Sequence, residues 1–299
     1  MKEPRTLSSR AVENRTGWTF VLPALAIYLF YFLAPIPLSA YYSLFQWSGV
    51  SALDDFIGFS NWNRLVRDAV FWVSVRNNVL LVVLSVVIQL PLGLLLAVYV
   101  SSKLKGTQTL KFVFFLPMTM SAVAIGLTWR YVFDANFGLL NGLLEAIGLP
   151  ELARSWLGNP RYALPAVVAV VCWQFIPYYM VIFAAALAGI PRDLIDSAAI
   201  DGAGPVQTFF RIKLPLLGNT VRMAIILSVT GSLKYFALVF VMTGGGPYHA
   251  SELMATYMYK QAFSNFRMGY GSTVAVFMFL LSFVVSVLIL RIRRKDEAT

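Results

Sequence analysis

Residues 196–215 read DSAAIDGAGPVQTFFRIKLP, a polar and helix-breaking stretch that separates two apolar segments of membrane-spanning length. Upstream of it, Pro191 suits the first turn of a short helix, and Asp193 stands near the positive end of that helix. Gly202 is placed to end the helix in a left-handed conformation, and a second amphipathic run follows. The sequence therefore predicts a helix-turn-helix between two membrane helices.

The composition assigns the chain to the polytopic membrane proteins. Of its 299 residues, 59% are hydrophobic and 13% are charged, which is too apolar a mixture for a soluble fold. Several apolar runs approach the ~20 residues that a helix needs to cross a bilayer. We predict an all-α fold with six transmembrane helices, and the loop above connects the fourth to the fifth. The predicted spans are Phe20–Tyr42, Asn78–Val100, Lys111–Phe133, Ala163–Gly189, Leu217–Met242 and Thr273–Leu290.

The basic residues predict the orientation of these spans. If the N-terminus is inside, 15 of the 24 lysines and arginines fall on inner segments and eight on outer loops, while Lys234 lies within the fifth span. Lysine and arginine accumulate in cytoplasmic loops. We therefore expect both termini and the 196–215 loop to face the cytoplasm. The net charge of +10 then reflects topology rather than nucleic-acid binding.

Several chemistries lack the residues that they require. No lysine directly follows a glycine, which excludes the Gly-Lys-Ser/Thr of a P-loop, so energy has to come from a partner. His249 is the single histidine and Cys172 the single cysteine, so we expect no metal site and no disulfide. We interpret His249 as a solvated loop residue. With no catalytic constellation evident, we predict that the chain is not an enzyme.

A second motif follows the fifth span, where residues 243–247 read TGGGP. Three glycines permit positive φ and the close approach of another backbone, while Pro247 prevents the membrane helix from continuing. An aromatic segment from Tyr257 to Phe263 comes next. We expect this segment to be exposed in an outer loop.

Both motifs resemble those of binding-protein-dependent ABC importer permeases. The cytoplasmic coupling loop of that family begins Glu-Ala-Ala, where this chain has Asp196, Ser197 and Ala198. The two departures keep the sign of the charge and the small size. An ordinary amphipathic connector is the alternative. The residues that we assign to the coupling loop are Asp196, Ser197, Ala198, Asp201, Gly202, Ala203, Ile212, Leu214 and Pro215.

The glycine turn, in its position after the fifth span, resembles the carbohydrate-uptake branch of these permeases, specifically the maltose-permease-like first subunit of a heterodimer. The resemblance implies that this region forms the outer gate or a contact for the binding protein. The residues concerned are Gly244, Gly245, Gly246, Pro247, Tyr257 and Tyr259. Docking of the aromatic segment on the bilayer interface is an equally simple alternative.

The resemblance implies several partner proteins. The chain would be one permease subunit of an ATP-driven importer in a bacterial or archaeal cytoplasmic (inner) membrane, forming the path for a sugar or sugar-like solute. Its partners would be a second permease subunit, two cytoplasmic ATPase subunits and an extracytoplasmic solute-binding protein. The chain itself would bind no cofactor, because ATP and magnesium are used by the ATPase.

The resemblance also divides the chain into four regions. These are a cytoplasmic tail (1–17), the first transmembrane helix with an outer loop (18–72), the permease core (73–291) and a second cytoplasmic tail (292–299).

Polar and aromatic residues inside the predicted spans are candidates for the substrate path. Polar groups at membrane depth are costly unless they face a cavity or another helix, and aromatic rings suit the apolar faces of sugars. The alternative is that such residues join helices or face lipid. We also expect Pro177 or Gly231 to open the backbone toward a cavity. The candidates are Thr119, Ser121, Trp173, Gln174, Tyr178, Thr230, Ser232, Lys234 and Tyr235.

An ion-coupled secondary transporter is the main alternative function. Such a protein usually carries acidic residues within its spans and an internal inverted repeat, and the sequence shows neither. A membrane-embedded enzyme would need a paired base and nucleophile, or metal ligands, at one depth. Copurification with a cytoplasmic ATPase would separate the importer from both alternatives.

Overall fold

The computed structural model describes residues 9–102 and 106–296. The predicted tails, 1–17 and 292–299, lie partly outside these ranges. Lys103 and Lys105, which were counted among the inner basic residues, also lie outside them. Within the described ranges the chain is helical, and an isolated bridge between Phe45 and Phe56 is the one pairing of extended backbone. The all-α prediction is confirmed. The chain forms two compact units, one from Met1–Arg67 with Lys260–Phe277 and one from Asp68–Tyr259 with Met278–Thr299.

The first unit contains the first apolar span and the beginning of the last helix. Its elements are α1 (Ser9–Tyr28), the π-helical η1 (Leu29–Leu33), α2 (Pro35–Tyr42), α3 (Ser60–Arg67), η5 (Lys260–Ser264) and the first part of α16 (Met268–Asp296). Asn61 on α3 is buried and donates hydrogen bonds to the carbonyls of Ser43 and Phe45 at 3.0 and 2.9 Å. These bonds anchor α3 to the segment that follows the first span.

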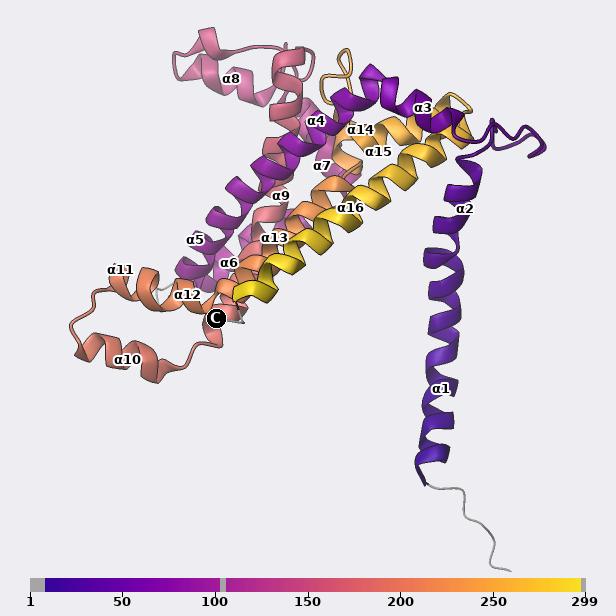
Figure 1. The fold of residues 1–299 in the computed structure, drawn as a ribbon. Coiled ribbons are helices and arrows are strands. Elements are labelled where there is room, and N and C mark those ends of the chain that lie inside the picture. Colours follow the sequence, from indigo (N-terminus) through magenta and orange to yellow (C-terminus); the bar gives the residue numbers. More distant parts are fainter. Residues whose placement is uncertain (1–8, 103–105, 297–299) are drawn as a thin grey trace, which may run out of the picture. The chain divides into compact units, whose positions relative to one another are not determined.

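The second unit is a helical bundle around α9 (Pro160–Ala188), in which Val167, Met180 and Phe183 are buried (Figure 1). Gly93 allows α5 to approach α9 closely, because a Cβ at this position would lie 2.7 Å from the Cβ of Tyr179. The elements before α9 are α4 (Ala69–Leu84), the π-helical η2 (Ser85–Gln89), α5 (Leu90–Val100), α6 (Thr107–Thr119), α7 (Ala122–Val132), α8 (Leu139–Ala146) and η3 (Pro150–Leu152).

The rest of the second unit follows α9 in the chain. It comprises α10 (Arg192–Ile200), α11 (Pro205–Thr208), the π-helical η4 (Phe209–Lys213), α12 (Leu214–Leu216), α13 (Gly218–Leu233), α14 (Ala237–Met242), α15 (Met254–Tyr259) and the later part of α16.

The multi-span prediction is confirmed, with shifted boundaries. The second span begins at Ala69 rather than Asn78, because Asp68 caps α4 by accepting hydrogen bonds from the amides of Val70 and Phe71 at 3.0 and 3.1 Å. In the described part of the chain, five helical stretches are long and apolar enough to cross a membrane: Trp18–Tyr42, Ala69–Val100, Pro160–Ala188, Gly218–Met242 and Met268–Arg291.

The third predicted span is not one straight helix. Its two halves, Thr109–Thr119 and Ala122–Val132, meet at an angle of 98°. Met120 and Ser121 have extended backbones, and the Ser121 hydroxyl accepts a hydrogen bond from the Ala124 amide at 3.1 Å. Ser121 is thus the N-cap of a new helix, which explains the bend.

Candidate functional site

The predicted coupling loop consists of α10, a turn at residues 201–204, and the helical run α11–η4–α12. Gly202 has φ +82°, so the expected left-handed conformation is confirmed. The amides of Gly202 and Ala203 donate to the carbonyls of Ala199 and Ala198 at 3.1 and 2.9 Å. This pair of bonds is a Schellman motif and explains where α10 ends. Pro191 lies at the N-cap position, one residue before the predicted first turn.

Most side chains of this loop face solvent or a surface that another molecule can cover. Asp196 and Ser197 are exposed on α10, whereas Ala198 is buried. Two apolar side chains project from the end of α10 and from α11, with Ile200 exposed by 85% and Val206 by 70%. Apolar side chains gathered in this way are typical of contact surfaces between proteins. Of the other assigned residues, Asp201, Gly202 and Pro215 are exposed and Ala203, Ile212 and Leu214 are half-buried.

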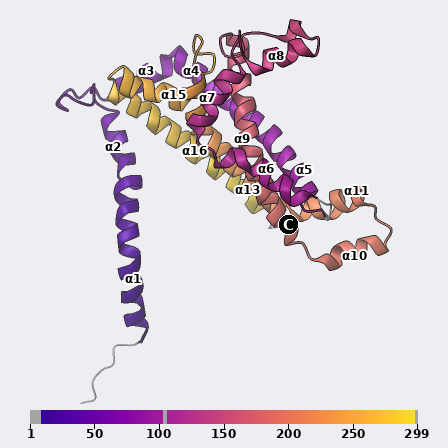
Figure 2. The ribbon, with the colours of Figure 1, turned by 180° about the vertical axis from the view of Figure 1, so that it is seen from behind.

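The coupling loop lies at one end of the second unit. Figures 1 and 2 show α10, α11 and α12 at the same end of the bundle as the C-terminal end of α16, while α8 lies at the opposite end. The C-terminal end of α5 and the beginning of α6 are also at the loop end. Within the second unit, this is the arrangement that alternating spans require.

The outer motif is more buried than predicted. Tyr257 is only 4% exposed, and its hydroxyl hydrogen-bonds to Asp68. Tyr259 is half-buried and packs on Phe236 and Phe240, with ring centroids 5.4 and 5.1 Å apart. The expectation of an exposed segment was wrong for these two tyrosines, because partners distant in sequence cover them.

The TGGGP turn wraps around a buried carboxylate. Glu252 is 0% exposed, and one of its oxygens lies 2.9 Å from Nδ1 of His249. His249, interpreted as a solvated residue, therefore has a specific partner, although its side chain remains 47% exposed. Gly244 and Gly245 have φ of +58° and +86°, which glycine permits, and Gly246 precedes the cis Pro247.

Replacing Gly245 by alanine should destabilise the protein measurably. A left-handed φ costs a non-glycine residue about 1–2 kcal/mol. In addition, the new Cβ would lie 2.5 Å from Oε1 of the buried Glu252. Thermal unfolding of the purified protein should therefore begin at a lower temperature. The matched control is Gly204→Ala, since Gly204 has φ −69° and open space around its Cβ position. Equal melting temperatures for the two variants would contradict the account of this turn.

The fifth span is interrupted at the predicted path. α13 ends at Leu233 and α14 begins at Ala237, so Lys234, Tyr235 and Phe236 lie in a break between two helices. Pro177 and Gly231, which were expected to open the backbone, lie inside α9 and α13. Interrupted helices at membrane depth are tolerated where they line a cavity or are buried in protein. The break at residues 234–236 interrupts the helical hydrogen bonding of this span.

The aromatic and amide candidates cluster along α9 and the break. Trp173 is 41% exposed and packs edge-on against Trp129 on α7, with ring centroids 5.4 Å apart. Phe175 packs in the same way against Tyr235, and Tyr178 against its neighbour Tyr179. Gln174 is buried to 6% exposure, and its Oε1 has no hydrogen-bond partner among the described residues. A buried amide oxygen without a partner is costly and suits a position that a ligand or water completes.

The hydroxyl candidates are engaged locally instead. Thr119 donates to the carbonyl of Leu116 at 2.8 Å, and Thr230 to that of Ile226 at 2.7 Å. Ser121 serves as the helix cap described above. Ser232 is buried, and its carbonyl accepts from Asn78. Lys234 is exposed. These bonds give the hydroxyls of Thr119, Ser121 and Thr230 structural roles without bringing them into one site.

Two buried asparagines were not among the residues predicted from the sequence. Asn77 and Asn78 lie on α4, and Asn78 is 0% exposed. The sequence did contain a signal for them, because two amide side chains stand at the beginning of an apolar run. A buried amide without a hydrogen-bond partner is costly there, so such residues are expected to have partners. Both side chains reach backbone groups of residues 249–254, which lie far away in the sequence.

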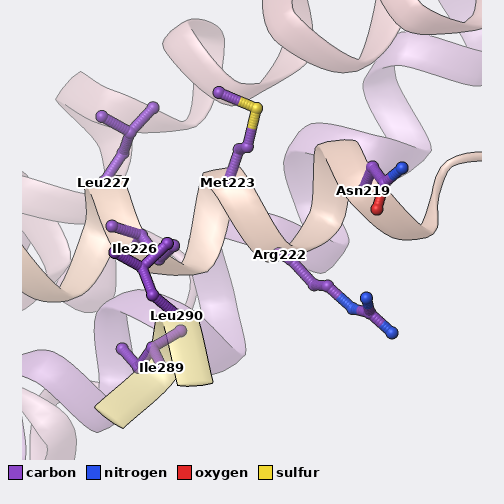
Figure 3. A pocket seen from close by; sticks show the side chains of 7 residues that line it. All are labelled: Asn219, Arg222, Met223, Ile226, Leu227, Ile289 and Leu290. Carbon is purple, nitrogen blue, oxygen red and sulfur yellow. The ribbon is translucent and has the colours of Figure 1, made fainter. Parts of the chain in front are cut away.

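A separate cavity of about 350 Å³ lies between α13 and α16 (Figure 3). Its apolar wall includes Met223, Ile226 and Ile289, and Figure 3 shows the Arg222 side chain directed away from Met223 and Leu227. No residue proposed for the substrate path lines it. This cavity and the candidate path are therefore distinct.

Comparison with known proteins identifies relatives along nearly the whole chain. The family model described as "Binding-protein-dependent transport system inner membrane component" matches residues 89–295. "Probable ABC transporter permease protein YurN" of Bacillus subtilis is 38% identical over 273 residues, which cover 91% of this chain and 93% of that protein. "Multiple sugar-binding transport system permease protein MsmF" of Streptococcus mutans is 31% identical over 292 residues, covering 97% and 100%.

The fold has a close counterpart among solved structures. A chain of a bacterial ABC transporter "involved in the import of the acidic polysaccharide alginate" superposes with a TM-score of 0.85. The alignment covers 97% of this chain and 98% of that chain, at 20% sequence identity. At this identity the likeness shows that the fold is shared.

Proposed function

Because the chain belongs to the binding-protein-dependent transport system inner membrane components, we propose that it forms half of the path of an ATP-driven importer for a sugar or sugar-like solute. The chain is a multi-pass membrane permease subunit. The observation that carries the proposal is the family match over residues 89–295, which contains the loop with the Schellman turn at Gly202 and the interrupted fifth span. The sugar class is supported by relatives such as MsmF, whose name specifies multiple sugar binding. Nothing in these comparisons supports the ion-coupled alternative.

The coupling loop is the proposed contact for the ATPase. α10 and the turn present small residues together with the exposed Ile200, so that the backbone of another protein can approach closely. The Asp196 side chain is exposed and can pair with a basic group of the ATPase. The Schellman motif makes this element stiff enough to transmit a push from the partner. Two ATPase subunits would bind and hydrolyse ATP with magnesium, because this sequence has no P-loop of its own.

The complete assembly would contain a second permease subunit and a solute-binding protein on the outer side. The binding protein would release solute toward the outer motif, and ATP-driven closure of the ATPase pair would tilt the helices that the coupling loop carries. The solute would then pass the aromatic and amide groups of α9 and the break in the fifth span. This sequence of events is an alternating-access cycle.

Copurification tests this proposal directly. The chain, solubilised from the cells that produce it, should elute with a cytoplasmic ATPase and with a second permease. Elution without any ATPase, under conditions that retain other membrane complexes, would count against the importer.

The proposed topology predicts a clear labelling pattern. A cysteine introduced at Ser102 should react with a membrane-impermeant maleimide only from the cytoplasmic side, and one at Ser51 only from outside, because basic residues concentrate on the inner segments. The native Cys172 is buried, so its background reaction should be low. Labelling of Ser102→Cys in intact cells would contradict the six-span arrangement.

A further inference from the structure

Asn78 occupies a position that links three separate parts of the second unit. Its side chain is completely buried on α4 and uses both ends of its amide. Nδ2 donates to the carbonyl of Ser232 at 2.9 Å, and Oδ1 accepts from the amide of Met254 at 2.7 Å. α4, the end of α13 and the start of α15 therefore meet at one residue.

The bond to Ser232 lies directly at the break in the fifth span. In a continuous α-helix the Ser232 carbonyl would accept from the amide of Phe236, four residues later. In the structure this carbonyl accepts from the Tyr235 amide at 3.2 Å and from the Asn78 side chain. The Asn78 amide thus takes the place of the backbone donor and stabilises the interrupted conformation.

Asn77 holds the adjoining segment of the outer motif. Its Nδ2 lies 3.3, 3.1 and 3.0 Å from the carbonyl oxygens of His249, Ala250 and Glu252. These carbonyls belong to the turn that surrounds the buried Glu252 carboxylate. Two neighbouring asparagines on α4 therefore bind the outer turn, the first residue of α15 and the interrupted span.

We infer that Asn77 and Asn78 are positioning residues that make residues 249–254 and the break at residues 234–236 move as one body during the transport cycle. The inference rests on the proposed function, in which the outer motif meets the binding protein and the break lines the path. The Asn78 amide, with both ends hydrogen-bonded, and the Asn77 amide nitrogen fix one arrangement, because any displacement leaves buried polar groups unpaired. A change at the outer turn then reaches the path through these side chains.

Hydrogen exchange in the purified complex with its ATPase, in lipid nanodiscs, tests the inference. We expect the Met254 amide of the wild-type chain to exchange slowly. Adding ATP with vanadate should change exchange in residues 249–257 and 232–240 to the same degree. In Asn78→Leu the Met254 amide should exchange at least about tenfold faster, since its buried acceptor is lost. The two segments should then respond to nucleotide independently.

Ser74→Ala is the matched control, because Ser74 is a buried polar residue on the same helix whose hydroxyl donates to the local carbonyl of Phe71. It should behave as the wild type. If Asn78→Leu does not assemble, Asn77→Leu tests the contacts of Asn77 with the outer turn. In this variant, hydrogen exchange at residues 249–252 should become faster and should no longer follow the response of residues 232–240 to nucleotide, while the Met254 amide stays protected. Joint responses of the two segments in a folded Asn variant would overturn the inference. A wild-type complex that lacks an ATPase or shows no response to nucleotide would instead refute the proposed function.

Discussion

Replacing Asp196 by lysine should abolish the stimulation of ATP hydrolysis by the solute-loaded binding protein, while the chain still inserts into the membrane. Asp196 is exposed on α10, and lysine is as compatible with a helix as aspartate, so the backbone should stay intact. The substitution places a positive charge against the basic group that we expect on the ATPase. The measurement is ATP hydrolysis by the complete complex in lipid, with and without the loaded binding protein.

Asp193→Lys serves as a charge-matched control. Asp193 is exposed in the first turn of the same helix but lies outside the residues assigned to the coupling loop. Its reversal should cost only the favourable interaction with the helix N-terminus, about 0.3–1 kcal/mol, and should leave stimulation largely in place. Equal loss in both variants would mean that the general charge of the loop matters, rather than the Asp196 position.

Gly202→Val should impair the same step by a different route. A Cβ at Gly202 meets no atom within 4 Å, so the cost within the chain is the left-handed φ of +82°, about 1–2 kcal/mol. The larger expected loss comes from collision of the side chain with the ATPase cleft. Gly204→Val is the control, since Gly204 is equally open but has φ −69°. If ATP hydrolysis is stimulated normally and solute is taken up normally with both Asp196→Lys and Gly202→Val, the loop is only a connector between two spans.

Replacing Gln174 by leucine should reduce solute uptake about tenfold without affecting association with the ATPase. Gln174 is buried in α9 beside Trp173, and its Oε1 has no hydrogen-bond partner among the described residues. If a solute hydroxyl completes this amide in the path, leucine removes a polar contact worth about 1–3 kcal/mol. The measurement is the concentration dependence of uptake into vesicles that contain the complete complex.

Gln89→Leu provides the comparison for this second prediction. Gln89 is also a buried glutamine in a span, but its amide nitrogen lies 3.2 Å from the Ser85 hydroxyl and 3.7 Å from the Cys172 sulfur. Its loss should lower the stability of the protein rather than the apparent affinity for solute. A lowered stability and an unchanged uptake curve for Gln174→Leu would assign Gln174 a structural role only.

Features that depend on local chemistry could be predicted from the sequence. The length of the apolar segments predicted the spans. The grouping of glycine, proline and small residues predicted the turn at Gly202, whose left-handed conformation needs no distant partner. The bend after α6 also had a local signal, because Ser121 precedes an apolar run as an N-cap residue does. The continuous hydrophobicity of Lys111–Phe133 concealed that signal.

Features that depend on distant partners could not be predicted in this way. Tyr257 belongs to an aromatic segment of the kind that faces a membrane surface, yet its contact with Asp68 buries it. At the break beside Lys234, the Ser232 carbonyl accepts a hydrogen bond from the Asn78 amide, which is supplied from another span. Pro177 lies inside the long helix α9 without ending it. At Tyr257 and at the break, tertiary hydrogen bonds outweighed local propensity.

The most direct test of the central claim is solute uptake by proteoliposomes that contain this chain with its second permease and ATPase subunits. The probe is the solute that copurifies with the binding protein. We predict uptake only when the binding protein is outside and ATP is inside, and uptake should persist after ionophores collapse the proton and sodium gradients. Uptake by the chain without an ATPase, driven by an ion gradient and lost on adding ionophores, would contradict the account.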